Sequence, residues 1–238
     1  MTIESIREPA DLRRLSYPEV DELAGEIRDF IVQAVATNSG HLGSNLGAVE
    51  LTLALHRVFD SPTDAILWDT GHQAYVHKIV TGRAAGFAQL RQAEGLSGYP
   101  SREESKHDYI ENSHASPVLS YAYGMSVARD AGVDKHRHIV AVIGDGSMTG
   151  GMAYEALNNL GHSGKRVIVV LNDNGRSYAP TVSNLSQGAL SNKLTDIRLN
   201  PVYVRRQRKI EKFLKNLPVI GVQAERGMEA FKAGVREF

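Results

Sequence analysis

The stretch HIVAVIGDGSMTGGMAYEALNNLGHSGKRVIVVL, residues 138–171, decides the fold. Its two apolar runs, at 138–143 and 166–171, are typical of buried strands, and the segment between them is predicted to form a helix. A strand, a helix and a strand within about 30 residues predict a βαβ unit with a parallel strand pair. Uninterrupted apolar strands indicate that helices cover both faces of the sheet. We therefore predict an α/β fold with a mostly parallel sheet and helices on both faces.

Outside this unit, the chain alternates between helical patterns and short apolar runs. SYPE at 16–19 predicts a capping box, and the apolar residues that follow it have helical spacing. AILW at 65–68 predicts a further buried strand. Gly, Pro and Ser make 82–114 mostly loop, and 172–200 is polar and irregular. Other helices are predicted over 46–58, 74–80, from 116 onward and over 225–237.

Composition excludes several classes of protein. The 238 residues include 27 Lys plus Arg and 27 Asp plus Glu, so nothing favours nucleic acid as a partner. Cysteine is absent, which leaves oxygen and imidazole as metal ligands. The charged N-terminus has no secretory core, and no apolar run approaches the ~20 residues of a membrane span. We expect a cytoplasmic protein with no membrane partner.

A carboxylate interrupts the glycine-rich turn GDGSMTGG, where Asp145 lies between two glycines. A dinucleotide-binding turn would need a third glycine where Thr149 stands. It would also place an unscreened carboxylate beside phosphate, at a cost of about 4 kcal/mol for a charge pair 4 Å apart. A Walker-type loop is excluded because its Gly-Lys-Ser/Thr is missing. A Mg²⁺–diphosphate site gives Asp145 a favourable role, with phosphate oxygens completing the metal's shell and helix N–H groups facing the diphosphate.

A second polar loop follows the second strand of the unit, with the residues Asn172, Asp173 and Asn174. Ligands of open parallel sheets bind beyond the carboxyl ends of the strands, and neighbouring strands would bring both loops together. This pairing favours the metal. The competing interpretation stays open at this point: Asp145 caps the helix, and Asn-Asp-Asn is an ordinary turn.

Three of the nine histidines lie in turn sequences of small residues. They are His41 in SGHLGS, His72 in DTGHQ and His114 in NSHAS. Loops concentrate binding groups, and imidazole suits proton transfer near neutral pH. A zinc site is a weaker alternative because no HExxH arrangement is present.

Several longer motifs sharpen this interpretation. They are SGHLGSNLGAVELTLALHRVFD, ILWDTGHQAYVHKIVTGR, GLSGYPSREES, ENSHAS and GDGSMTGGMAYEALNN, with IREPADLRRL and GMEAFKAGVRE near the two ends. GDG followed one crossover later by NDN is similar to the thiamin-diphosphate signature. With these motifs the chain resembles the 1-deoxy-D-xylulose-5-phosphate synthase family, which is related to transketolase. The resemblance covers nearly the whole chain and is least clear over 184–223.

The resemblance implies a site for thiamin diphosphate and Mg²⁺. It implies catalytic roles for His41, beside the reactive thiazolium carbon, and for His72. A small Ser147 where the family usually has Ala is expected to be tolerated. The implied metal ligands are Asp145, Asn174 and the main-chain carbonyl of Arg176. The implied cofactor contacts are His72, Ser113, His114, Ala115, Gly146, Ser147 and Asn174.

The implied reaction is a transferase reaction. It converts pyruvate and D-glyceraldehyde 3-phosphate to 1-deoxy-D-xylulose 5-phosphate and CO₂, for isoprene and thiamine biosynthesis, in a homodimeric enzyme. Residues 1–238 match only the diphosphate-binding domain, without the pyrimidine-binding and C-terminal domains. We expect the isolated chain to be inactive and to be part of a full-length synthase. The alternatives are one subunit of a split transketolase-like enzyme and a non-catalytic Mg²⁺–diphosphate-binding module.

Overall fold

Three parallel strands organise the part of the chain that the structure, a computed structural model, describes: residues 3–173. The strands are β1 (Ala65–Trp68), β2 (Ile139–Gly144) and β3 (Ile168–Asn172), in the order β1-β2-β3. The described residues belong to the first of two compact units, Met1–Val182, and the second, Ser183–Phe238, lies outside them. The register pairs Gly144 with Asn172, so β2 and β3 end side by side. The predicted βαβ unit is confirmed.

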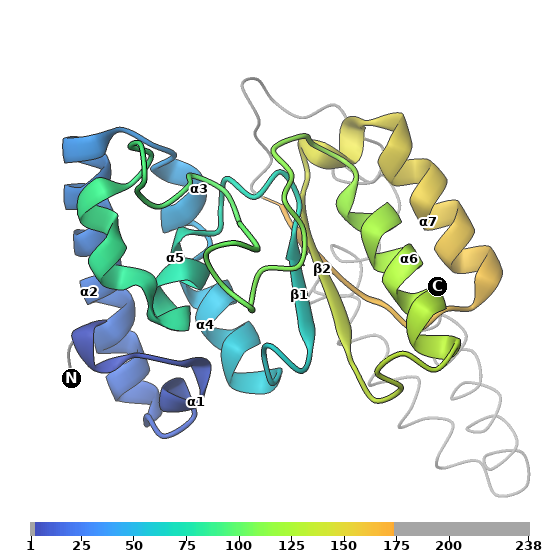
Figure 1. Cartoon of the computed structure of the whole chain (residues 1–238), viewed down its shortest axis with the longest axis horizontal. Coiled ribbons are helices and arrows are strands. Elements are labelled where there is room, and N and C mark those ends of the chain that lie inside the picture. The colour runs from blue at the N-terminus through green and yellow to red at the C-terminus, as the bar shows by residue number, and fades with distance from the viewer. Residues whose placement is uncertain (1–2, 174–238) are drawn as a thin grey trace, which may run out of the picture. The chain divides into compact units, whose positions relative to one another are not determined.

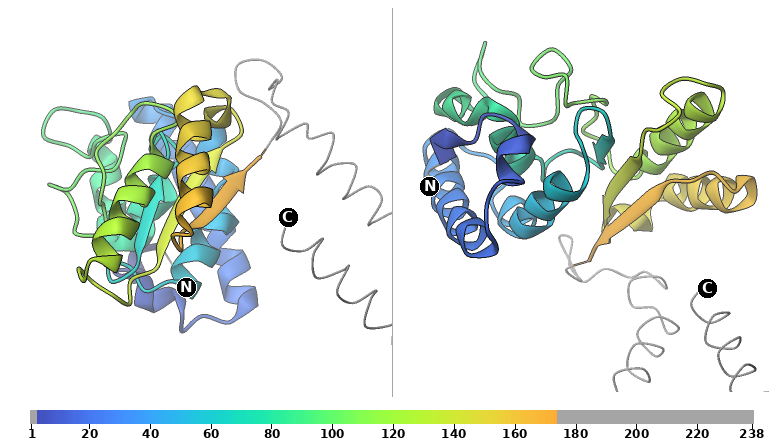
Figure 2. Two further views of the ribbon diagram at one scale, coloured as in Figure 1. Left: turned by 90° about the vertical axis from the view of Figure 1, so that its right-hand side faces the viewer. Right: turned by 90° about the horizontal axis from the view of Figure 1, so that it is seen from below.

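Helices pack on both faces of this sheet, as predicted (Figure 1). Side chains alternate between the faces along each strand. Leu67, Ala141 and Ile143 face a core shared with α6 (Val118–Asp130) and α7 (Gly151–Ser163). Trp68 and Val142 face the other way, toward Leu55 of α4 (Val49–Val58). The view from below in Figure 2 separates the two layers.

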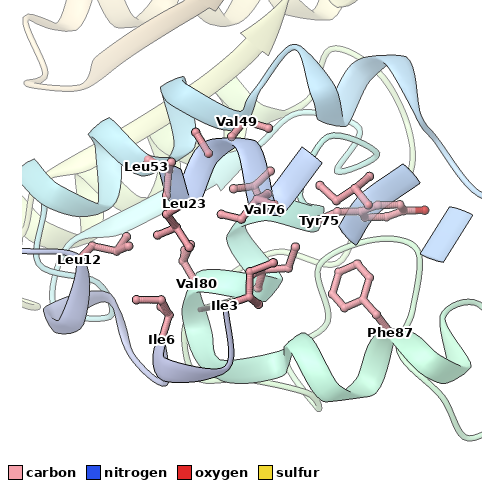
Figure 3. Packing of buried hydrophobic residues seen from close by; sticks show 14 of the residues in the cluster. Ile3, Ile6, Leu12, Leu23, Val49, Leu53, Tyr75, Val76, Val80 and Phe87 are labelled. Atoms are coloured by element: carbon pink, nitrogen blue, oxygen red, sulfur yellow. The ribbon is translucent and has the colours of Figure 1, made fainter. Parts of the chain in front are cut away.

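A third core lies among the helices of the N-terminal half, where α2 (Tyr17–Asn38) packs with α4 and α5 (Tyr75–Lys78) (Figure 3). The predicted capping box starts α2: the Glu19 carboxylate accepts hydrogen bonds from the N–H and hydroxyl of Ser16, at 2.7 and 2.6 Å. Leu23 and Ile27 of the same helix are almost fully buried. This core therefore supports the loops that precede α4 and α5.

Short elements complete the described chain. They are η1 (Ile3–Ser5), α1 (Pro9–Leu12), α3 (Gly43–Leu46), the π-helical turn η2 (Ile79–Arg83), and the 3₁₀ turns η3 (Ala84–Gln89) and η4 (Ser147–Thr149). No described helix is long and apolar enough to cross a lipid bilayer.

Two expectations need correction. The helix predicted over 46–58 begins only at Val49, because the chain first makes the separate turn of α3, which ends before Gly47. The strand predicted at 166–171 is not buried along its length: Val169 and Leu171 are 39% and 43% exposed. β3 is an edge strand of the described sheet, as β1 is, but its side chains are only partly covered, whereas those of β1 are all buried. The helix predicted over 225–237 lies outside the described residues.

Candidate functional site

The carboxyl edge of the sheet gathers the polar residues that follow the strands. Asp145 follows β2 and is 3% exposed. Its backbone N–H donates to the carbonyl of Asn172 at the end of β3, at 3.4 Å. The Asn172 side chain in turn donates to the Gln73 side-chain oxygen at 3.2 Å, which connects this edge to the DTGHQ loop. The strand ends from which the two loops were predicted to start therefore lie side by side, as expected.

Asp145 does not cap the helix that follows it. The N-cap of α7 is Gly150, and no described side chain makes a cap hydrogen bond there. The helix-capping alternative for Asp145 is therefore wrong. The first N–H groups of α7 are left without a side-chain cap, as an anion-binding helix start requires. A buried carboxylate next to such a helix start fits a cation that lies between it and phosphate oxygens.

Close packing joins the turn after β2 to the segment before α6. A Cβ built on Gly150 would lie 2.1 Å from the Ser116 hydroxyl oxygen. That hydroxyl donates to the carbonyl of Ser147 at 2.7 Å, and the Ser147 hydroxyl lies 3.5 Å from that of Thr70. Ser147 is itself only 9% exposed. Gly146 belongs to the same turn and precedes η4.

Asp69, at the end of β1, positions the segment that carries three predicted cofactor contacts. Its buried carboxylate accepts hydrogen bonds from the backbone N–H groups of Ser116 and Val118, at 2.9 and 3.0 Å. This contact holds the exposed residues 113–115 against the sheet edge. Asp69 was not predicted from the sequence, although an acid at the end of a predicted strand, as at Asp145, was a signal that could have identified it.

His41 and His72 come from different loops and lie together. Their ring centroids are 5.5 Å apart in an edge-to-face arrangement. The Nδ1 atom of each ring is buried and has no hydrogen-bond partner among the residues that the structure describes. Burial lowers the pKa of both imidazoles, helped by Arg91 for His41 and by His41 for His72. Both rings are therefore neutral at neutral pH, with an unused polar atom that a ligand could engage.

Asn45 fixes the backbone of both histidines and was also missed. Its side-chain nitrogen donates to the carbonyls of His41 and His72, at 2.6 and 2.8 Å, and its oxygen accepts from the Tyr75 N–H at 2.8 Å. The side chain is fully buried. One amide therefore binds the two loops to each other and to the start of α5.

The predicted metal set is only partly described. Of its three members, Asn174 and Arg176 lie outside the described residues, and Asp145 lies within them. Residues 3–173 contain no group of three or more acidic or histidine side chains that could hold a metal, and this includes the histidines of the zinc alternative. The donor that is present, a buried carboxylate, is the hard oxygen ligand that Mg²⁺ prefers.

Comparison with known proteins shows the family to which the chain belongs. The family described as 1-deoxy-D-xylulose-5-phosphate synthase matches residues 3–238. The chain belongs to the 1-deoxy-D-xylulose-5-phosphate synthase family. It is similar to the synthase of that name from Mycobacterium avium, with 55% identity over 99% of this chain. It is similar at 54% identity to those from Saccharopolyspora erythraea and Mycobacterium leprae, again over 99% of this chain. The chain spans about a third of each of these synthases, 36% of their length.

Proposed function

We propose that this chain forms the part of a 1-deoxy-D-xylulose-5-phosphate synthase that binds thiamin diphosphate and Mg²⁺. The reaction would join a two-carbon unit of pyruvate to D-glyceraldehyde 3-phosphate and release CO₂. Family membership supports the proposal. The observation that carries it is the buried Asp145 carboxylate beside the end of β3 and the uncapped start of α7. Residues 1–238 would together form the diphosphate-binding domain.

Asp145 would hold the metal together with the side chain of Asn174 and the carbonyl of Arg176. The diphosphate would lie against Gly146 and Ser147, whose turn leads into α7. Residues Ser113, His114 and Ala115 would contact the cofactor from the segment that Asp69 holds. Bound thiamin diphosphate would supply the electron sink that decarboxylation of pyruvate requires.

The histidine pair would manage protons next to the cofactor. A neutral ring can accept a proton at a free Nδ1 or donate one from the other nitrogen, and both rings have that atom unpartnered among the described residues. Asn45 would keep the two rings in a fixed position relative to each other, because its side chain binds the backbone carbonyls of both residues. His41 would act nearest the reacting carbon, and His72 would also contact the cofactor.

The rest of the enzyme would come from outside these residues. Pyruvate and D-glyceraldehyde 3-phosphate would be the substrates, in a cytoplasmic homodimer, and the chain alone would have little or no activity. If the enzyme is instead split between two chains, with the pyrimidine-binding domain on the second, this chain alone would likewise have little or no activity. A binding module without catalysis would retain cofactor affinity and show no turnover with any partner.

The test uses the chain alone and fused to the remaining residues of the Mycobacterium avium synthase. Calorimetry should detect Mg²⁺-dependent thiamin-diphosphate binding to the chain alone, and the fusion should release CO₂ and form 1-deoxy-D-xylulose 5-phosphate. In the fusion, His41→Asn should keep near-normal cofactor binding and lose turnover. Binding without turnover in the unmodified fusion would favour the binding module, and absence of binding would refute the proposal.

A further inference from the structure

The segment Ser97–Asp108 passes directly beside the histidine pair. The ring of Tyr99 lies with its centroid 5.8 Å from that of His41. Pro100 packs against the DTGHQ loop, since a Cβ built on Gly71 would come within 2.5 Å of the proline Cδ. Gly71 also has a φ of +78°, which favours glycine. The tip of this segment is therefore fitted closely to both histidine loops.

Four charged side chains anchor the segment through ion pairs: two belong to the segment, and two come from residues 78–83. Arg83 of η2 makes a two-pronged contact with the Asp108 carboxylate, at 2.7 and 2.9 Å, and reaches Glu104 at 3.1 Å. Lys78, fully buried at the end of α5, also contacts Glu104. The Asp108 side chain has no exposed surface, and that of Arg83 is 9% exposed. We call these four residues, Lys78, Arg83, Glu104 and Asp108, the buried ion network.

The two carboxylates of this network also hold the backbone on either side of Tyr99. Glu104 accepts a hydrogen bond from the N–H of Ser97 at 2.6 Å. Asp108 accepts one from the N–H of Ser101 at 2.8 Å. The tip of the segment thus lies between two anchored points. Each anchor is a hydrogen bond to a charged acceptor, which is the stronger class of hydrogen bond.

Burial of four charges has a cost that their mutual attraction only partly offsets, so the network is poorly explained as a source of stability. A hydrophobic cluster could fill this space with less desolvation. What charges and hydrogen bonds supply in addition is a single defined geometry for the chain they bind. Here that chain is the one that carries Tyr99.

We propose that the buried ion network acts as a set of positioning residues that hold Tyr99 as a wall of the cofactor site over His41. This inference rests on the proposed function, because His41 would lie beside the reacting carbon. Tyr99 would exclude water from one side of the imidazole and keep it buried and neutral. Arg83 would act only through the segment that it binds.

The experiment replaces Arg83 with Met and measures two properties of the protein without cofactor. NMR titration should show the His41 pKa rising by about half a unit toward its ordinary value, because the ring gains contact with water. Trypsin should cut after the exposed Arg102 about tenfold faster, because a broken buried pair lets the segment open. Arg83→Lys keeps the charge without the fork and should lie between wild type and Arg83→Met.

Arg129→Met is the matched control. Its side chain is 6% exposed and binds Asp130 and the carbonyl of Arg166, in another part of the described chain. It should change neither the His41 titration nor cleavage after Arg102. If Arg83→Met does not fold, Asp108→Asn replaces it, with the same expected result.

A double variant separates positioning from general loosening. Tyr99→Ala should raise the His41 pKa as Arg83→Met does, and the two changes together should raise it no further, because both remove the same wall. Additive shifts, or a His41 titration that Arg83→Met leaves unchanged, would overturn the proposal. Calorimetry of thiamin-diphosphate binding to wild type tests the proposed function separately from this inference. Absence of binding would refute the proposed function, but the coupling of Arg83 and Tyr99 to the His41 titration could still be measured.

Discussion

At the scale of single residues, two aspartates that end neighbouring strands have different partners. Asp69 accepts hydrogen bonds from two backbone N–H groups and so belongs to the protein's own framework. Asp145 lies beside the end of β3 and the start of α7, where the proposed metal would be held. The same residue type at the same edge therefore positions a loop in the case of Asp69, and in the case of Asp145 it is the residue that we propose as a metal ligand.

Replacement of Asp69 by Ala should lower the free energy of unfolding by about 3 kcal/mol, because two buried N–H groups would lose a charged acceptor. Urea unfolding followed by the fluorescence of Trp68, the one tryptophan of the sequence, measures the change. Asp29→Ala is the control: this aspartate is exposed on α2, so its replacement should change the free energy of unfolding by about 0.5 kcal/mol or less. Equal effects of the two variants would contradict the role given to Asp69.

Asp145, His41 and His72 could be singled out from the sequence because each stands in an unusual pattern. Asp145 is an acid between two glycines, and the two histidines lie in turns of small residues. The sequence did not predict Asn45 or Asp69. Their hydrogen bonds go to backbone atoms that are 27 to 49 residues away, apart from one to His41. A backbone N–H or carbonyl has no residue type, so no motif marks its partner. Such contacts become visible only when the loops are placed in space.

At the scale of elements, periodicity identified the βαβ unit and the capping box of α2, and both are confirmed. It did not identify the π-helical turn at 79–83 or the exposed side chains of β3. The π turn contains Gly82 at a φ of +86°, where a Cβ would lie 2.3 Å from the Arg7 carbonyl oxygen. That constraint comes from a distant segment, so local sequence patterns do not reveal it.

Two adjacent glycines at the start of α7 give a matched test of its packing. Gly150→Ala should destabilise the protein by about 1–3 kcal/mol, because the new methyl group would displace the Ser116 hydroxyl from the Ser147 carbonyl. Gly151→Ala meets no atom within 4 Å and should be neutral or stabilising by up to about 1 kcal/mol. Thermal unfolding measures both. Similar losses for the two variants would mean that Ser116 does not pack tightly against this turn.

At the scale of the whole molecule, buried histidines should make the fold sensitive to acid. Burial lowers the pKa of His56 and His77, with His77 itself adding to the shift of His56, and lowers that of His107 to about 4. Below about pH 6.5 the unfolded chain takes up protons that the folded chain does not. Stability should therefore be complete above about pH 6.5 and fall as the pH drops to 4, by about 3 kcal/mol from His107 alone and further from His56 and His77.

Denaturant unfolding at several pH values measures this slope. His107→Asn should reduce it, because Asn cannot take up the proton that favours the unfolded chain. His162→Asn is the control, since His162 is exposed near the end of α7, and it should leave the slope unchanged. A wild-type stability that is flat between pH 6.5 and 4 would contradict the burial of these rings. Asp108 should affect stability only at lower pH. Burial would raise the pKa of its carboxyl, but hydrogen bonds from His77 and Arg83 hold that pKa well below its usual range.

The most direct test of the whole account is calorimetric titration of thiamin diphosphate into the Asp145→Ala variant, with and without Mg²⁺. The Mg²⁺-dependent affinity for thiamin diphosphate should fall at least about 100-fold, while circular dichroism should show an intact fold. Asp145→Asn, which keeps an oxygen and loses the charge, should fall between that variant and wild type. Asp29→Ala, on the exposed face of α2, should bind as wild type does. Unchanged Mg²⁺-dependent binding to Asp145→Ala would contradict the metal assignment, and with it the function proposed for this edge of the sheet.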